Sequence, residues 1–551
     1  MSQESSSGWK WQTGPMVWEV SRGALIAAAL FWVVVLVLVL HRHHAMYPSY
    51  ASFDQGIFNQ VFWNNSHGRW FQSSLSSSLS TPVVHDGQVP DVAYRRLGQH
   101  FTPALLLWLP IYAIAPSPTT LFIIQVTLVT LAGLVLYNLA RCYLTPQLST
   151  LIAISYYGAN SVIGPSLANF HDICQLPLFF FSLFLALEKR WWALFWIMAG
   201  LILLVREDAG VALFGVGVYL LVSRRYPWMG AILCGLSLGY MLLLTNLIMP
   251  LFSEDISRRF MIEQFGQYVE GDEASTLDVI GGMISNPGRL LMELVNPVGD
   301  KIRYLLGHWL PLMLVPAIAP SAWLLAGVPL LKTFLRQDPI ALSINLRYSM
   351  NIVPGLFYGA VLWWSVHPQA IRQRWVRGLW IAAITLSILF TITSNPNRSL
   401  SFIIPDSIQP QVYLPAPQQW QHVAKIRGFM AEIPNDASVS ATSHIVAHLS
   451  SRRQVLRFPD LSLQNDADEV VEMDYVLLDL EQLVTYQTVF ADDRQRLQRA
   501  VRVVDRILER DRYGVQGFTE GILFLQRATP SQPDALVAWQ AYRQAIAPAV
   551  D

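Results

Sequence analysis

Apolar runs that can cross a bilayer fill most of the first 394 residues. A helix needs about 20 apolar residues to span the hydrocarbon core, and fewer where it is packed inside protein. The runs lie at 23–41, 119–140, 147–164, 173–188, 191–205, 209–223, 228–249, 306–320, 321–336, 350–366 and 376–394. They predict an α-helical multipass membrane domain with about 11 transmembrane helices, the first of which resembles an uncleaved signal anchor.

Charge separates this region from the rest of the chain. Of the 76 Asp, Glu, Lys and Arg residues, 34 lie in the last 157 positions. Helical patterns alternate there with short apolar strands, the helices at 422–433 and 492–510 and the strands at 437–440, 455–458, 475–480 and 521–526. We therefore predict a transmembrane domain over 1–394 and a small soluble α/β domain over 395–551. The net charge of zero gives no argument for nucleic-acid binding.

The positions of the basic residues predict how the chain is oriented in the membrane. They also decide whether one short apolar run, Phe101–Ala115, crosses it; prolines flank and interrupt this run. If the N-terminus is cytoplasmic and this run does not cross, the basic groups at 141, 189–190, 224–225 and 372–377 all fall inside, as the positive-inside rule requires. We therefore expect 101–115 to be a re-entrant or interfacial helix. It would belong to a large first external loop, 41–118, with juxtamembrane helices. The protein would lie in the plasma (cell inner) membrane with its C-terminal domain outside the cytoplasm.

Asp54, just after the first span, is the first candidate for chemistry. Ionisable groups near membrane depth are costly and usually functional. A carboxylate here could deprotonate an acceptor hydroxyl or amine, or help hold a divalent cation against a phosphate leaving group. Alternatively, Asp54 caps a juxtamembrane helix. The same loop contains His100 and a serine-rich patch, Ser73–Ser80, which looks like a mobile loop.

Three further groups fall on the same predicted side of the membrane. His171-Asp172 suits a proton relay or a metal site, or is an ordinary loop. Arg206-Glu207-Asp208 lies directly between two apolar runs, where Arg could bind phosphate, or where the three charges join two helices as an ion pair. Arg347-Tyr348 precedes a span and suits a lipid phosphate, or is a snorkelling anchor with an interfacial tyrosine.

Several of these segments together resemble a bacterial and archaeal multipass family known as domain of unknown function 2079. The likeness runs over most of 45–360 and continues in the tail. The segments that carry it are Phe53–Gln60 with Trp63-Asn64, His100–Pro103, His171-Asp172, Arg206-Glu207-Asp208 (where the family often has Lys first), Arg347-Tyr348-Ser349 with Pro354, Ile433–Val439 and Tyr475–Asp479.

The architecture of that family is similar to the GT-C superfamily of glycosyltransferases. Those enzymes use a polyprenyl-phosphate sugar donor and keep an acidic residue in the first external loop, near the acceptor. The resemblance implies that role for Asp54. This chain lacks the second acidic residue that some GT-C enzymes carry beside the first, so metal dependence is left open.

Three hypotheses follow. The leading one is a GT-C type glycosyltransferase that moves a sugar from a polyprenyl phosphate to an extracytoplasmic glycan, lipid or protein, with Asp54 as base and Arg206 or Arg347 on the donor phosphate. The second is a transporter or flippase for a lipid or small molecule, although the inverted repeats typical of transporters are not evident. The third is a scaffolding membrane protein, which would not need Arg206-Glu207-Asp208 within its bundle. No cofactor is certain, and a divalent cation is possible.

Overall fold

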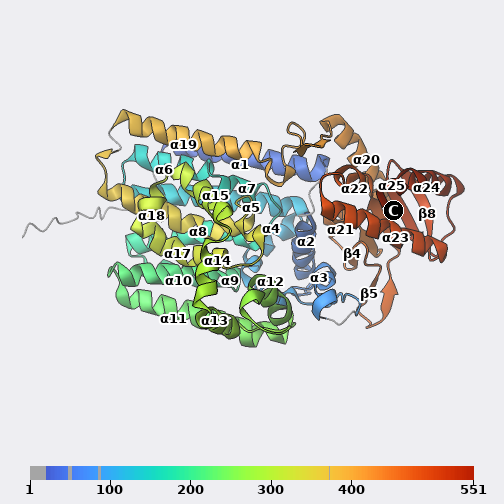
Figure 1. Cartoon of the computed structure of the whole chain (residues 1–551), viewed down its shortest axis with the longest axis horizontal. Coiled ribbons are helices and arrows are strands. Elements are labelled where there is room, and N and C mark those ends of the chain that lie inside the picture. The colour runs from blue at the N-terminus through green and yellow to red at the C-terminus, as the bar shows by residue number, and fades with distance from the viewer. Residues whose placement is uncertain (1–19, 47–51, 85–87, 371–372, 551) are drawn as a thin grey trace, which may run out of the picture.

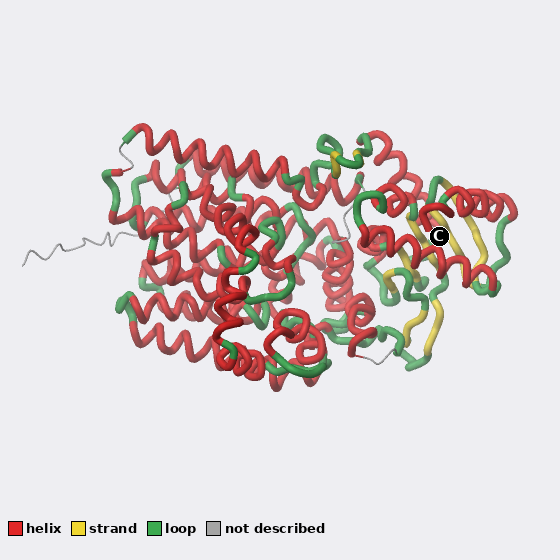
Figure 2. The backbone as a smooth tube through the Cα atoms, in the orientation of Figure 1, coloured by secondary structure: helices red, strands yellow, loops and turns green. Residues whose placement is uncertain are grey.

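The computed structural model describes residues 20–46, 52–84, 88–370 and 373–550. A bundle of long helices forms one end of the molecule, and a small sheet with its own helices forms the other (Figures 1 and 2). The bundle is built mainly from α1 (Arg22–Ala45), α5 (Pro118–Arg141), α6 (Pro146–Tyr157), α8 (Leu176–Lys189), α9 (Trp192–Val205), α10 (Ala209–Val222), α11 (Pro227–Leu243), α17 (Pro320–Phe334), α18 (Val353–Val366) and α19 (Arg374–Thr393).

Four of the described helices are long and apolar enough to cross a membrane, namely Arg22–Ala45, Pro118–Arg141, Pro227–Leu251 and Arg374–Thr393. Shorter apolar helices such as α9, α10 and α18 pack among them. The count of about 11 spans therefore stays a prediction. The run at 101–115 is a 3₁₀ helix, Pro103–Trp108, followed by the six-residue α4 (Leu109–Ile114).

The run predicted as a span at 306–320 is not one helix, so this prediction was wrong. The helix α15 (Val298–Trp309) ends in a 3₁₀ turn, Leu310–Leu312, and α16 (Val315–Ile318) is a separate short piece. Pro311 and Pro316 explain the break, because proline has no N–H to donate and clashes with the preceding turn. Met313 and Leu314 between them adopt positive φ angles of 54° and 59°.

The C-terminal region contains a five-stranded sheet in the order β4-β3-β7-β9-β8. Strand β3 (Val439–Ala441) runs parallel to β4 (Val455–Arg457) and β7 (Tyr475–Asp479), while β9 (Ile522–Arg527) is antiparallel to β7 and to β8 (Tyr513–Thr519). The first three and β9 overlap the predicted strands. Strand β8 was not predicted, because its two glycines and a glutamine interrupt the apolar pattern.

Each face of this sheet is covered by different helices. One face packs against α22 (Glu481–Tyr486), α23 (Ala491–Glu509) and α24 (Pro533–Ala545). The other packs against α20 (Ala416–Glu432) and α21 (Ser443–Leu449), and also against two helices of the first loop, α2 (Ser52–Ser66) and α3 (Ser74–Val84). The first loop therefore completes the core of the C-terminal region.

Helix α2 is buried on two sides. Phe53 and Ile57 join the apolar core of the sheet, whereas Phe58 and Phe62 join the core of the helical bundle. Between these faces, Asn59 Nδ2 donates to Ser450 Oγ at 2.9 Å, and Gln60 Nε2 donates to the backbone carbonyls at 452 and 453 at 3.3 and 3.2 Å. The helix is thus a shared wall between bundle and sheet.

The serine-rich patch is a buried helix, so the expectation of a mobile loop was wrong. Most serine side chains of α3 are buried. Ser74 Oγ donates to the backbone carbonyl of Val455 at 2.7 Å, and Ser80 Oγ donates to Asp255 Oδ1 at 2.6 Å. Small hydroxyl side chains allow close packing, and these partners replace the water that a polar sequence would otherwise require.

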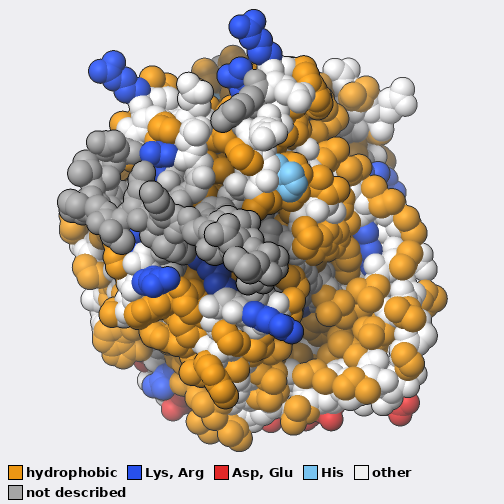
Figure 3. Space-filling view, turned by 90° about the vertical axis from the view of Figure 1, so that its left-hand side faces the viewer, with side chains coloured by type: hydrophobic (Ala, Val, Ile, Leu, Met, Phe, Trp, Pro, Cys, Tyr) orange, Lys and Arg blue, Asp and Glu red, His pale blue; other side chains and the backbone are white. Residues whose placement is uncertain are grey.

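The end of the bundle opposite the sheet carries basic side chains. The α10–α11 and α18–α19 connections turn at that end (Figure 1), and its surface shows Lys and Arg among hydrophobic side chains, with Asp and Glu only near the lower edge (Figure 3). This separation of the basic loops from the sheet is what the predicted orientation requires. The orientation itself, with a cytoplasmic N-terminus and an external C-terminal region, stays a prediction.

We expect Gly56→Leu to destabilise the protein by about 1–3 kcal/mol through overpacking. A Cβ at Gly56 would lie 3.1 Å from Val446 Cγ1 and 3.3 Å from Leu75 Cδ1, at the seam between α2 and α21. Gly428→Leu is the matched control, because nothing lies within 4 Å of its Cβ position on α20. Thermal unfolding in detergent measures both. Equal stability of the two variants would show that the seam is not tightly packed.

Candidate active site

Asp54 forms one centre of charge together with residues from two distant segments. Its Oδ2 accepts a hydrogen bond from Arg347 Nη1 at 3.2 Å and lies 3.7 Å from His171 Nε2. Arg347 Nη1 is also 3.1 Å from His171 Nε2. The Asp54 side chain is 31% exposed, against 7% for His171. A reachable carboxylate is therefore held between a guanidinium and a buried imidazole.

The capping alternative for Asp54 is compatible with this arrangement but does not account for it. Asp54 is the third residue of α2, in the first turn, where the helix dipole favours a carboxylate. The 3₁₀ turn Arg347–Asn351 brings Arg347 to it, and His171 arrives just before a second 3₁₀ turn, Asp172–Gln175. Two chain segments converge on the carboxylate, which a cap alone does not need.

His171 is neutral in this setting. Burial lowers its pKa well below the usual range, and the nearby charges of Arg347 and Arg96 lower it further. Because Arg347 is always a donor, the contact at 3.1 Å makes His171 Nε2 an acceptor and places the ring proton on Nδ1. His171 Nε2 therefore accepts the hydrogen bond of Arg347, and the lowered pKa disfavours its protonation, so this geometry suits holding Arg347 in place better than relaying a proton.

A second centre of charge lies between α9 and α10. Arg206 donates from Nε and Nη2 to the two oxygens of Asp208, both at 2.6 Å, and Lys332 of α17 donates to the same carboxylate. Glu207 accepts from the backbone N–H of Phe101 at 3.0 Å and lies 2.8 Å from His100 Nδ1. These contacts join α9, α10, α17 and the first loop, as expected if Arg206-Glu207-Asp208 forms an ion pair between helices.

Arg96 lies within electrostatic reach of both centres and was not among the predicted site residues. Its guanidinium is buried and sits 4.6 Å above the ring of Phe58. Burial lowers the pKa of Arg96, and the carboxylates of Asp172, Asp54 and Glu207 oppose this shift. Arg96 Nε and Nη1 have no hydrogen-bond partner among the described residues, and neither does the buried Asp172 Oδ2. The sequence signal that could have identified Arg96 is its position, four residues before the candidate His100 in the first loop.

A cavity of about 230 Å³ opens beside the second centre. Its polar end is formed by His100, Arg206, Glu207, Asp208 and Lys332, and the rest of its lining is almost entirely apolar, including Val211, Met241, Ile256, Met261, Phe265, Val279 and Leu331. A smaller pocket shares Asp208 and Lys332 with it and reaches Arg336 and Tyr348. Tyr348 Oη in turn accepts from Arg347 Nη2 at 3.3 Å. The cavity thus leads towards Asp54 through a line of charged and aromatic side chains.

The residues around Asp54 do not fit a metal site. Its near neighbours are Arg347 and the neutral His171, and a guanidinium at 3.2 Å opposes a second cation. In the parts of the chain that the structure describes, no set of three His, Cys, Asp or Glu ligands close enough to share an ion includes Asp54.

Asp208→Asn should destabilise the protein by about 3–5 kcal/mol, because it leaves the buried cations Arg206 and Lys332 without their shared counter-ion. Unfolding in detergent measures the loss, and adding Lys332→Met should recover part of it. Asp338→Asn is the control, since Asp338 is 31% exposed and its contact with Arg336 is 3.4 Å long. A loss no larger than that of the control would mean that Asp208 does not hold these cations.

Two solved structures with similar folds were found by structural comparison. ArnT from Cupriavidus metallidurans, crystallised with undecaprenyl phosphate, gives a TM-score of 0.45 at 11% identity, covering 93% of this chain and 100% of that one. An oligosaccharyltransferase from Archaeoglobus fulgidus, in complex with zinc and sulfate, gives 0.45 at 12% identity, covering 92% and 73%. At this identity and TM-score, the similarity does not assign the activities of these two proteins to this chain.

A search of curated proteins found no match. The family described as "Predicted membrane protein (DUF2079)" matches residues 42–524. The match includes both centres of charge, the cavity and nearly all of the C-terminal sheet, and it confirms the resemblance seen in the sequence. The chain therefore belongs to the DUF2079 family of membrane proteins.

Proposed function

We propose that this protein is a membrane glycosyltransferase of the GT-C type that moves a sugar from a polyprenyl-phosphate donor to an extracytoplasmic acceptor. The observation that carries the proposal is the reachable Asp54 carboxylate beside Arg347, with a largely apolar cavity and its charged end nearby. Arg96 is within electrostatic reach, and two of its nitrogens have no hydrogen-bond partner in the described part of the chain. The acceptor is a glycan, lipid or protein.

The cavity supports a lipid phosphate as the donor. An apolar wall suits a polyprenyl chain, and its charged end places the phosphate on the side of the second centre of charge. The cations that line this end, Arg206 and Lys332, are both bound by Asp208, so the phosphate needs further cations. Arg206 is already engaged by Asp208 through two hydrogen bonds, which leaves it poorly placed to bind a second anion. Arg96 retains free N–H groups, and Arg347 shares its own with Asp54 and His171. Arg96 and Arg347 are therefore better candidates for the phosphate than Arg206.

Asp54 supplies the base in this proposal. It would take the proton of an acceptor hydroxyl or amine as that group attacks the anomeric carbon of the sugar. The bond from that carbon to the phosphate oxygen breaks, and the phosphate leaves with the electron pair. Arg96 and Arg347 would balance the charge that develops on it. His171 and Asp172 would complete the polar wall, with His171 Nε2 holding the Arg347 guanidinium beside Asp54.

Asp54→Asn should reduce sugar transfer by about 10²–10⁴-fold, because the amide keeps the size of the side chain but cannot take a proton. Purified protein with a panel of polyprenyl-phosphate-linked sugars measures this, and thermal unfolding confirms that the variant is folded. Asp91→Asn is the control, since Asp91 lies in the same loop and accepts from the backbone of Ala93, which an amide can also do. Transfer at the wild-type rate by Asp54→Asn would remove the active-site assignment.

Arg96→Gln should weaken binding of undecaprenyl phosphate by about tenfold or more, as expected for one lost hydrogen bond to a charged group. Native mass spectrometry in detergent measures binding. The neighbouring Arg95, which is exposed, provides the matched control Arg95→Gln. Equal effects of the two variants would show only general charge attraction. Movement of the lipid phosphate across vesicles without any sugar transfer would favour a transporter.

A further inference from the structure

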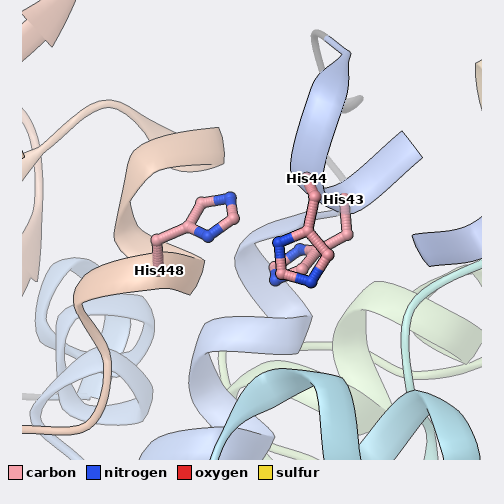
Figure 4. Close-up of side chains that lie close together, drawn as sticks. All are labelled: His43, His44 and His448. Carbon is pink, nitrogen blue, oxygen red and sulfur yellow. The ribbon is translucent and has the colours of Figure 1, made fainter. Parts of the chain in front are cut away.

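Three histidines from opposite ends of the sequence meet where the bundle joins the C-terminal region. His43 and His44 lie in the last turn of α1, and His448 lies near the end of α21. Figure 4 shows their rings gathered in the space between the two helices. One ring nitrogen from each lies within 4.8 Å of the others, and the rings of His43 and His448 stack with centroids 4.1 Å apart.

The chemistry of this cluster is that of a metal-binding site. A neutral imidazole keeps a nitrogen lone pair, and the close stack of His43 on His448 together with the Arg427 guanidinium beside His44 disfavours a charged ring here. Neutral imidazole nitrogen is the preferred ligand of zinc and similar transition metals. Moreover, all three histidines sit at helix C-termini, whose carbonyl ends carry partial negative charge and favour a cation.

We propose that His43, His44 and His448 bind one divalent transition-metal ion of the zinc class, which ties the end of α1 to α21. Zinc–nitrogen bonds of about 2.0–2.1 Å place tetrahedral ligand atoms about 3.4 Å apart. The three ring nitrogens now lie within 4.8 Å of one another, so binding requires the rings to rotate modestly and bring them closer. This rotation would also break the stack of His43 on His448. Three protein ligands leave a fourth position for water.

The surroundings of the cluster fix one helix and set a limit on affinity. On α21, His444 lies one turn before His448 and its Nε2 is 3.0 Å from Asp479 Oδ2, which holds this helix to the sheet. The Arg427 guanidinium disfavours metal binding, because it donates to the backbone carbonyl of His44 and lies 3.5 Å from His44 Nδ1. This positive charge opposes a second cation, so its removal should tighten binding.

The site would stabilise a contact that matters for the rest of the molecule. The C-terminal region covers α2 through α21, and α2 carries Asp54. A metal ion joining α21 to α1 would fasten this cover to the first membrane helix. The ion would have a structural role and take no part in the proposed transfer, so the two proposals can fail separately.

Full-length protein in detergent, stripped with a chelator, tests the site by titration with Zn²⁺ against a chromophoric competitor. We expect one equivalent of Zn²⁺ per chain, and binding at least about tenfold weaker in His43→Ala and His448→Ala. His67→Ala is the control, because in the described part of the chain the His67 ring hydrogen-bonds to Trp63 and Ser66 of its own turn. Unchanged affinity in both cluster variants, or no stoichiometric binding, would overturn the proposal.

Arg427→Gln guards against loss of binding through misfolding, because its expected effect has the opposite sign. Removing the charge beside His44 should increase Zn²⁺ affinity, whereas a damaged fold could only reduce it. Co²⁺ in place of Zn²⁺ reports the ligand geometry by absorption, with intense visible bands expected for a tetrahedral nitrogen site. Weaker Zn²⁺ binding by a folded Arg427→Gln variant would contradict a metal at this position.

Discussion

The burial of α2 on two sides is the constraint on which the site depends. One face of this helix belongs to the core of the bundle through Phe58 and Phe62, and the other belongs to the core of the C-terminal sheet through Phe53 and Ile57. Asp54 lies in its first turn, between these two faces. The position of the proposed base is therefore set jointly by both parts of the chain, which gives the C-terminal region a structural reason to be present.

The charges at the site follow the general cost of burying ions. Asp208 satisfies Arg206 and Lys332, and Glu207 is held by His100 and a backbone N–H, so most buried charges have partners. Arg96 and Asp172 are different, because each leaves a buried polar atom without a hydrogen bond among the described residues. An unpaired buried guanidinium is costly unless a ligand completes it. That contrast supports Arg96 and Asp172 as the proposed contacts of a substrate.

The end of α1 is a second place where distant segments meet. Arg42 is fully buried there, and its guanidinium donates to Asn169 Oδ1 at 3.3 Å and to the backbone carbonyl of Asn397 at 3.2 Å. Asn169 lies two residues before His171, so this contact also fixes one wall of the site. The histidine cluster occupies the same last turn of α1. Contacts to the first helix therefore anchor both the His171 segment and the C-terminal region.

The sequence determined the class of the molecule and most of its candidate residues. Apolar periodicity and the distribution of charge indicated a helical membrane part and a separate α/β part, because burial in lipid and burial in a small core demand different compositions. Asp54, His171 and Arg347 were identified because ionisable residues beside membrane spans are rare. The convergence of Asp54, His171 and Arg347 was not visible, since Arg347 lies 176 positions from His171 and 293 from Asp54 along the chain.

Only the tertiary structure decided how these residues are used. It brought Lys332 to Asp208 and left Arg96 Nε and Nη1 without a hydrogen-bond partner among the described residues. It also turned the serine-rich patch into a buried helix by supplying partners such as Val455 and Asp255. Finally, it brought together His448 and His43, which lie at opposite ends of the sequence. The local pattern of the sequence indicates which side chains are buried and which carry charge. Which partner each one finds depends on contacts between distant segments, and those exist only in the folded chain.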